Sequence, residues 1–358
     1  METLDRTLQY LTDNDIPFGG KIMVISGDFR QCLPVISGAS RAELVDAALN
    51  RSTLWKHFKV VTIYENMRVK LSNCPDAESF DKFTVTIGDG SIGSIEDTDL
   101  IEIPVDMCIE IDPNSPSNPE AERQTMIKLA NYVYTDLEEN FSKKGWMDGR
   151  AILAPTNKQV DIINDLITDN FPGIPIVLTS SDELSNPNDF QRYNTEYLNT
   201  LSPSGLPCHR LFIKKGMPLM LMRNLNPKEG LCNGTRLIFR QIHKNHLLEC
   251  TIVGGEHNDR TVLIPRISLR PKDRDFPFEW SRRQFPVRVA FAMTINKSQG
   301  QTLQNVGVWL NDGCFAHGQL YVCISRVGSP HSIKFAIRRI DGNPPNATSN
   351  VVYREVLI

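Results

Sequence analysis

The sequence predicts an α/β fold that carries a smaller all-β insert. Through the first half of the chain and again near its end, short runs of β-branched residues alternate with segments of helical periodicity. This alternation is typical of a mostly parallel sheet with helices on its faces. Between residues 191 and 284, strand patterns instead follow one another without helices between them. A length of 358 residues suits about two domains.

The first half supplies most of the predicted α/β elements. Apolar runs bounded by polar or turn residues predict strands over 21–26, 60–64 and 151–154. Apolar residues at helical spacing predict helices over 53–58, 76–87, 121–139 and 158–169.

The second half contains the predicted insert and the return to α/β character. Strands are expected over 217–222, 235–239, 246–253 and 260–267, and Asn233-Gly234 is a strong turn signal before the second of them. Strands over 287–293 and 306–310 and a helix over 319–326 follow.

Composition predicts an intracellular, soluble protein. The hydrophobic fraction is 41% and the charged fraction 23%, which is ordinary for a globular chain. The sequence has neither a secretory leader nor an apolar run of membrane-spanning length. The eight cysteines are scattered singly without a CxxC pair. This spacing argues against a zinc site or a disulfide framework and fits a reducing compartment.

Charge is unevenly distributed although the net charge is only −3. Segment 89–122 is acidic and includes Glu96, Asp97, Asp99, Glu102, Asp106 and Glu110. Segment 260–297 is basic and includes Arg266, Arg270, Lys272, Arg274, Arg282, Arg283 and Arg288. A basic stretch in an acidic protein suits phosphate binding, because each neutralised phosphate releases counterions. A solvated charged face accounts for the stretch equally well.

Two glycine-rich segments imitate nucleotide-binding loops. Residues 88–93 match GxGxxG, but a predicted helix precedes them and acidic residues follow, so a helix-terminating turn fits better than a pyrophosphate site. Gly19-Gly20-Lys21 fails as a phosphate-binding loop because Asp15 replaces the first glycine and Ile22 replaces the Ser or Thr. No GxxxxGK[ST] segment occurs in the 358 residues.

Other residues suit a phosphate better. Gly27, Asp28 and Gln31 follow the strand predicted over 21–26, and a neutral glutamine there can contact a γ-phosphate or orient the attacking water. An ordinary turn stiffened by Pro34 is the alternative. Arg68 and Arg326 offer planar charged forks that suit a transferring phosphoryl group, and surface salt bridges are the alternative for both.

A second polar group is predicted to contact a nucleic-acid backbone. The strand over 287–293 runs into a loop that contains Thr294, Lys297 and Ser298, whose donors suit backbone phosphates. Thr156-Asn157 repeats this design after the strand over 151–154, although either residue also suits a helix N-cap.

Five segments, in chain order, resemble the later motifs of the petite-integration-frequency (PIF-type) superfamily 1 DNA helicases, and most closely the versions encoded by Helitron transposable elements. They are GDFRQCLPV, YENMR, LAPTN, AFAMTINKSQGQT and HGQLYVCISR. GMPLMLMRNLNPKEGLCNGTRL resembles the small β accessory domain of that family. The resemblance implies a remnant of a first RecA-like lobe over 1–60, a second lobe over 61–190 and 285–358, and a barrel-like β insert over 191–284.

The resemblance also implies residue roles and ligands. Gln31, Arg68 and Arg326 would be catalytic, and Gly27, Asp28 and Gln299 would join them at the nucleotide, which is ATP with Mg²⁺ in the family. Single-stranded DNA would contact Thr156, Asn157, Thr294, Lys297 and Ser298, and forked duplex DNA would be a further partner. The implied activity is 5′-to-3′ translocation and unwinding, in DNA repair, recombination, telomere maintenance or transposon replication.

The sequence departs from the family pattern at its start. The family's phosphate-binding lysine and the Asp-Glu pair for magnesium would stand before GDFRQ, and neither is found in this chain. We therefore expect a chain that begins within the first lobe and is defective in ATP hydrolysis. One alternative is a remnant that binds single strands without catalysis. Another, an oxidoreductase based on residues 88–93, has only the GxGxxG match in its favour.

Overall fold

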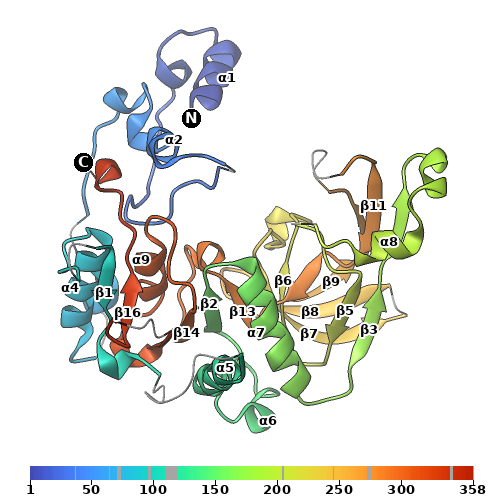
Figure 1. Ribbon diagram of the computed structural model, residues 1–358. Helices are drawn as coiled ribbons and strands as arrows, with labels where there is room; N and C mark the ends of the chain where they lie inside the picture. The colour runs from blue at the N-terminus through green and yellow to red at the C-terminus, as the bar shows by residue number, and fades with distance from the viewer. Residues whose placement is uncertain are drawn as a thin grey trace. The chain divides into compact units, whose positions relative to one another are not determined.

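The computed structural model describes residues 1–36, 38–63, 65–70, 74–95, 98–109, 119–203, 205–244, 246–271, 276–338 and 342–357 (Figure 1). These residues form two compact units. The first unit comprises Met1–Ala121, Ser298–Gln304 and Val308–Ile358, and the second comprises Glu122–Lys297 and Asn305–Gly307. Glu96, Asp97, Glu110, Lys272 and Arg274 of the charged stretches lie outside the described residues, as does Tyr64.

The second unit contains the parallel core of the predicted α/β fold. Strand β2 (Arg150–Ala154) pairs in parallel with β13 (Ala292–Thr294). Helix α7 (Asn157–Asn170) follows β2 and contacts both strands, and its Val160, Ile163 and Ile167 are buried. The helix predicted over 158–169 and the strand predicted over 151–154 are both confirmed.

Helix α5 (Pro119–Val133) lies mainly in this unit and packs against the start of β14 (Asn305–Leu310). A Cβ at Gly307 would stand 2.9 Å from side-chain atoms of Leu129 and Val133, so the absence of a side chain permits this close approach. The prediction of one helix over 121–139 is wrong at its end. Asp136 adopts a left-handed conformation (φ 50°), which separates α5 from the short helix α6 (Leu137–Asn140).

The predicted all-β region forms antiparallel sheets within the second unit. A five-stranded sheet has the order β12-β6-β7-β8-β9, a three-stranded sheet the order β10-β11-β4, and β3 pairs with β5. The bounds are β3 Ile176–Thr179, β4 Ser181–Leu184, β5 Arg210–Ile213, β6 Pro218–Leu221, β7 Arg236–His243, β8 Leu247–Val253, β9 Thr261–Pro265, β10 Ile267–Leu269, β11 Trp280–Gln284 and β12 Val287–Val289. The insert's antiparallel strands thus run from Ile176 to Val289.

Two apolar clusters stabilise these sheets. The larger is built from alternate residues of the five-stranded sheet, among them Leu219, Phe239 and Leu248, each fully buried. The smaller packs Trp280 and Phe278 against Leu198 of helix α8 (Thr195–Thr200). Alternating burial along β9 and β11 agrees with sheets that bury one face.

The first unit combines short helices with small sheet segments. Helix α4 (Ala77–Gly88) confirms the prediction over 76–87 and packs against α9 (Gln319–Ile324). Strand β1 (Leu100–Glu102) pairs with β16 (Ala347–Ser349) in antiparallel fashion. The remaining elements include α1 Glu2–Thr12, α2 Arg41–Asp46, α3 Met67–Lys70, the end of β14, β15 Ile333–Ile337 and the 3-10 turns η1 Pro17–Gly20, η3 Trp55–His57, η8 Pro330–Ser332 and η9 Arg354–Val356.

Two predicted strands are not formed in this unit. Residues 21–26 and 60–63 form neither a strand nor a helix, and η3 replaces most of the helix predicted over 53–58. Ile22 and Ile63 are 94% and 85% exposed, so these apolar runs do not find neighbouring strands among the described residues. A β-branched run predicts only that a segment suits a sheet; a strand also requires a partner for its backbone groups.

Among the described residues, no helix is both long enough and apolar enough to cross a membrane. The eight cysteines all lie within the described ranges and form no disulfide there.

Candidate functional site

The GDFRQ segment forms a tight loop around the carboxylate of Asp28. Asp28 Oδ1 accepts a hydrogen bond from the backbone N–H of Arg30 at 3.0 Å, and the Asp28 carbonyl accepts one from the Gln31 N–H at 3.1 Å. Asp28 Oδ2 accepts from the Tyr321 hydroxyl at 2.7 Å and, over a longer 3.4 Å, from Gln31 Nε2. Both carboxylate oxygens therefore already have protein donors, and Asp28 orients the loop that carries Gln31. Gly27 precedes it on the exposed backbone.

Residues just before α9 hold this loop from the other side. His317 Nδ1 accepts from the Tyr353 N–H at 2.9 Å, so Nε2 carries the proton and donates to the Phe29 carbonyl at 2.8 Å. Burial lowers the pKa of His317, which favours the neutral ring that this geometry requires. Gly318 follows with φ 72°, and a Cβ there would lie only 2.2 Å from the Arg30 carbonyl oxygen.

The loop is also tied to α4. Arg30 Nε donates to Asp89 Oδ1 at 2.6 Å, and Asp89 raises the pKa of this guanidinium. Gly88, the last residue of α4, allows the approach, since a Cβ there would come within 2.7 Å of Arg30 and Tyr321 atoms. The GxGxxG match at 88–93 thus begins at the end of a helix, as expected for a helix-terminating turn.

Gln299 and Arg326 lie close to the same loop. Gln299 Nε2 donates to the Cys32 carbonyl at 3.4 Å. Burial raises the pKa of the Cys32 thiol to about 12, and the positive charge of Arg326, which is itself buried, partly opposes this rise. Gln31, Gln299 and Arg326 therefore all lie at or near this loop of the first unit. All three were predicted to contact the nucleotide.

The Arg326 guanidinium is bound to the protein itself in this structure. Nη1 donates to the carbonyls of Ser298 and Gln301 at 3.1 and 3.0 Å, Nε donates to the Val322 carbonyl, and Nη2 donates to Ser325 Oγ. These bonds fix the polar segment 298–301 onto α9. Arg68 lies in α3, and its side chain is outside the described part of the chain, so its role stays a prediction.

The predicted DNA-contacting residues lie mainly in the second unit, at one edge of its parallel sheet. The register pairs Ala154 with Thr294, so the polar residues that follow β2 and β13 leave the sheet side by side. The Asn164 side chain bonds both backbone groups of Ala292, at 2.8 Å from its N–H and 3.3 Å from its carbonyl, and so holds β13 against α7. Thr156 caps α7 through its hydroxyl, as the N-cap alternative expected.

Arg288 joins this edge, although sequence reasoning placed it only in a general basic stretch. Its Nη1 donates to Asn157 Oδ1 at 3.3 Å and its Nη2 donates to Asp161 Oδ1 at 2.9 Å. Burial, and then the positive charge of Arg288, lowers the pKa of Lys297. Two cations thus lie within electrostatic range of each other beside the N-terminus of α7, which itself favours anions.

Ser298, in contrast, belongs to the first unit by its contacts and is fully buried. Its carbonyl is one of the acceptors of Arg326. The structure therefore does not place the Ser298 side chain on a surface with Thr156, Asn157 and Lys297.

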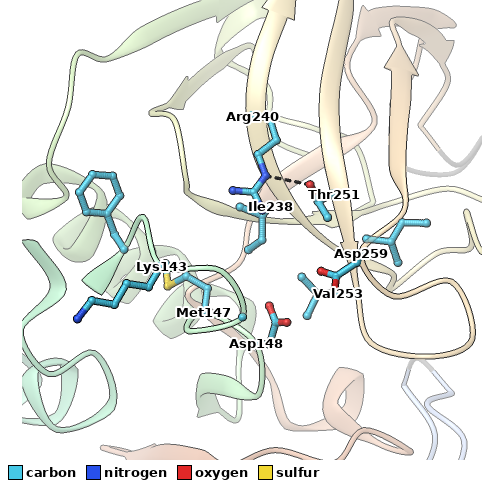
Figure 2. A pocket seen from close by; sticks show the side chains of 11 residues that line it. Lys143, Met147, Asp148, Ile238, Arg240, Thr251, Val253 and Asp259 are labelled. Carbon is cyan, nitrogen blue, oxygen red and sulfur yellow. Dashed lines mark hydrogen bonds between the residues drawn. The ribbon is translucent and has the colours of Figure 1, made fainter. Parts of the chain in front are cut away.

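A small pocket of the second unit contains none of the predicted site residues (Figure 2). It lies between segment 141–148 and strands β7 and β8, and Figure 2 shows Arg240 bonded to Thr251 beside Asp148 and Asp259. Its cavity volume is about 10 Å³, which is the least that holds one water molecule. It is too small for a nucleotide.

Sequence reasoning missed the positioning roles of His317, Gly318 and Tyr321, although all three lie in the HGQLYVCISR segment. Their partners lie roughly 290 residues earlier in the chain, as for Tyr321 and Asp28, which are 293 positions apart. Local spacing carries no signal of such a contact. A glycine beside a histidine at the start of a predicted helix was the one visible hint.

Two family sequence models match the chain. Residues 1–98 match the PIF1-like helicase family and residues 196–242 match the 2B domain of DNA helicase Pif1. Among curated proteins, human ATP-dependent DNA helicase PIF1 is 31% identical over 151 residues, which cover 39% of this chain and 21% of that protein. The Danio rerio protein of the same name is 23% identical over 93% of this chain and 43% of its own length. The chain thus spans less than half of either relative.

Solved structures share the fold. The crystal structure of Pif1 helicase from Candida albicans superposes with a TM-score of 0.60 at 23% identity, over 99% of this chain and 72% of that one. Bacteroides Pif1 bound to single-stranded DNA gives 0.60 at 21% identity, over 93% and 66%. These structures confirm the predicted RecA-like α/β fold with an inserted β domain. By its two matched segments, its motif order and its fold, the chain is related to the PIF1-type superfamily 1 helicases.

Proposed function

We propose that this chain is the part of an ATP-dependent DNA helicase that binds single-stranded DNA and contacts the γ-phosphate of ATP. The pairing of Ala154 with Thr294 carries the proposal, because it sets two polar segments side by side at one sheet edge. There, Thr156, Asn157 and Lys297 offer hydroxyl, amide and ammonium groups to backbone phosphates, which fix position without reading sequence. The similarly folded Bacteroides Pif1, whose crystal structure has single-stranded DNA bound, supports the same class of ligand.

The nucleotide half of the proposal rests on the loop around Asp28. Gln31 and Arg326 would contact the γ-phosphate, and Gln299 would connect the nucleotide with the DNA-binding segment. ATP, when bound, would supply the energy for 5′-to-3′ translocation. Arg326 would have to exchange its bonds to the carbonyls of Ser298 and Gln301 for phosphate oxygens. Such an exchange would couple γ-phosphate binding to movement of segment 298–301.

The residues at this loop do not fit a magnesium site. Asp28 is the carboxylate of the segment, and both of its oxygens accept hydrogen bonds from Arg30, Gln31 and Tyr321. Magnesium requires free oxygen ligands in near-octahedral geometry. Forked duplex DNA as a substrate and a nuclear location in a eukaryote belong to this proposal as well.

DNA binding is tested by fluorescence anisotropy of a labelled oligothymidine over a series of salt concentrations. Lys297→Ala should weaken the affinity and flatten its salt dependence by about 0.7 in the log–log slope, the value for one lost contact to a single strand. Lys82→Ala is the matched control, because Lys82 is exposed, pairs with Glu78 in the first unit and lies outside the proposed site. Equal affinities and slopes for Lys297→Ala and the unsubstituted chain would refute the DNA site.

A second candidate function is single-strand binding without catalysis. It is favoured by the bonded state of Arg326, whose guanidinium donates to the carbonyls of Ser298 and Gln301. Magnesium-dependent ATP hydrolysis, measured with and without oligothymidine, distinguishes the two. Turnover stimulated by DNA in this chain, lost in Gln31→Ala, supports the helicase; DNA binding without turnover supports the binding module.

A further inference from the structure

Three potential metal ligands gather in the first unit, outside both predicted sites. Cys74 Sγ, one carboxylate oxygen of Asp76 and a ring nitrogen of His331 all lie within 4.8 Å of one another. Cys74 and Asp76 stand just before α4, whereas His331 belongs to the turn η8 after α9. A separation of 255 residues explains why single scattered cysteines gave no sign of this cluster.

The distances suit one small cation. Asp76 Oδ2 and His331 Nε2 are 3.2 Å apart. With zinc bonds of about 2.0–2.2 Å to oxygen and nitrogen, two ligands of a tetrahedral ion stand about 3.4 Å apart. The Cys74 sulfur, within 4.8 Å of both atoms, reaches its expected separation of about 3.5 Å by a shift of about 1 Å.

The hydroxyl of Ser329 orients two of the three ligands. Ser329 Oγ accepts a hydrogen bond from the backbone N–H of His331 at 3.3 Å and lies 3.5 Å from Cys74 Sγ. Because that N–H already occupies one lone pair, the hydroxyl proton is available to a Cys74 thiolate. Groups that hydrogen-bond to metal ligands orient these ligands and thereby change the affinity for the metal.

The backbone around the ligands is fixed by neighbouring helices. The carbonyls of Cys74 and Asp76 accept from the N–H groups of Ala77 and Phe80, in the first turn of α4. Phe80 is buried, and α4 packs against α9, which is separated from η8 by five residues. Both ligand segments therefore start from a packed helix pair, which lowers the entropy lost when an ion binds.

We propose that Cys74, Asp76 and His331 bind one divalent cation of the zinc class, with water as the fourth ligand. The mixed sulfur, nitrogen and oxygen donors select zinc or cobalt over magnesium and calcium, which take oxygen ligands. On binding, the Cys74 S–H bond breaks, its proton leaves to solvent and a metal–sulfur bond forms. An Asp76–His331 ion pair alone would leave the nearby thiol unexplained. The bound cation would connect the residues just before α4 to η8, and its binding would require neither nucleotide nor DNA.

The test uses Co²⁺ as the probe on the full chain, in a phosphine reductant that keeps thiols reduced. The unsubstituted chain should show a thiolate-to-cobalt absorption band in the near ultraviolet that saturates at one equivalent and is displaced by Zn²⁺. Cys74→Ser should lose this band. Cys208→Ser is the matched control, because Cys208 is an exposed free cysteine, and it should keep the band.

His331→Ala and Asp76→Asn should each weaken cobalt affinity at least tenfold. Their side chains are exposed, so circular dichroism should show an unchanged fold even if Cys74→Ser unfolds. Zn²⁺ should raise the unfolding midpoint of the unsubstituted chain and of Cys208→Ser but not of His331→Ala. The proposal is overturned if no band saturates at one equivalent, if Cys74→Ser keeps it, or if a folded His331→Ala binds cobalt with unchanged affinity.

Discussion

The Tyr321 hydroxyl donates a 2.7 Å hydrogen bond to Asp28 Oδ2 across 293 positions of sequence. Burial and then this bond raise the pKa of Tyr321, so the phenol remains a donor at neutral pH. The contact joins the GDFRQ and GQLYV segments, and no local sequence pattern predicts that they meet. It also makes Asp28 a positioning residue, whose orientation determines where the Gln31 amide lies.

The close approach at Gly318 should be required for this arrangement. Gly318→Ala would put a Cβ 2.2 Å from the Arg30 carbonyl, so the loop or α9 must shift. Gly300→Ala is the matched control, because Gly300 has nearly the same φ (76° against 72°) but no atom within 4 Å of its Cβ position. We expect Gly318→Ala to lower the free energy of unfolding by about 1–3 kcal/mol more than the control. Urea denaturation measures the difference, and equal losses would contradict the close contact.

His317 should make stability depend on pH. Burial lowers its folded-state pKa below 6.5, so below that pH the unfolded chain binds a proton that the folded chain resists. Stability should therefore fall as the pH drops from about 6.5 towards the folded-state pKa, and this term should be absent at pH 8. His317→Gln, which retains a donor and an acceptor, should reduce the drop in the unfolding midpoint between pH 8 and pH 5.5.

The acid sensitivity should be reduced rather than abolished in that variant. Burial also lowers the pKa of His209, which contributes with the same sign. His57→Gln is the control, since His57 is exposed. A pH dependence of His317→Gln as steep as that of His57→Gln would show that folding does not lower the pKa of His317.

The β insert should depend on one buried ion pair. Arg282 and Asp182 are both fully buried, and Arg282 Nη2 donates to Asp182 Oδ2 at 2.6 Å. The same guanidinium donates to the carbonyls of Leu198, Leu201 and Pro207, which fixes α8 and the following loop onto β11. Arg282→Ala would leave Asp182 buried without its countercharge, and we expect a loss of about 3–5 kcal/mol in the free energy of unfolding.

Urea denaturation checks this loss against Arg283→Ala, whose exposed side chain neighbours Arg282 on the same strand. The control should change stability by less than about 0.5 kcal/mol. Similar losses for the two variants would mean that Arg282 is not the central contact of the insert.

Helices and strands were predicted correctly where the described residues include the neighbouring elements against which they pack. β2, α7 and β6 to β8 were predicted because their periodicity is local and their neighbours are present to bury it. The runs over 21–26 and 60–64 have equally strong strand patterns, yet no strand forms where they are described. Strand formation depends on long-range pairing, which a local pattern does not encode.

In the candidate sites, too, the sequence predicted features that depend on local residues and missed those that depend on contacts between distant residues. The polar residues after β2 and β13 were predicted as one group, and parallel pairing does bring Thr156 and Lys297 to one edge. The bonds of Arg326 to backbone carbonyls were not predictable, because a sequence motif identifies the guanidinium but not its acceptors. The cluster of Cys74, Asp76 and His331 was missed for a related reason, since metal-ligand spacing rules recognise only local ligands.

Arg288 should contribute positive charge to the proposed DNA-binding edge of β2 and β13. Its bond to Asn157 uses the amide oxygen, so the Asn157 NH₂ group keeps its capacity to donate, and its bond to Asp161 holds it at the start of α7. Arg288→Ala should weaken oligothymidine binding and reduce the salt slope by about 0.7 if Arg288 meets one phosphate itself. Arg288→Gln, which keeps an N–H donor without the charge, should recover part of the affinity but not the slope.

Arg260→Ala is the matched control for this variant. Arg260 also lies in the second unit and pairs with an exposed carboxylate, Glu229, at 2.9 Å, the same distance as the Arg288–Asp161 pair. Removing either arginine changes the net charge equally, so a purely global electrostatic effect would weaken DNA binding by the same factor in both variants. A selective loss in Arg288→Ala would instead locate the bound strand at the carboxyl edge of β2 and β13, since Arg288 is fixed there by Asn157.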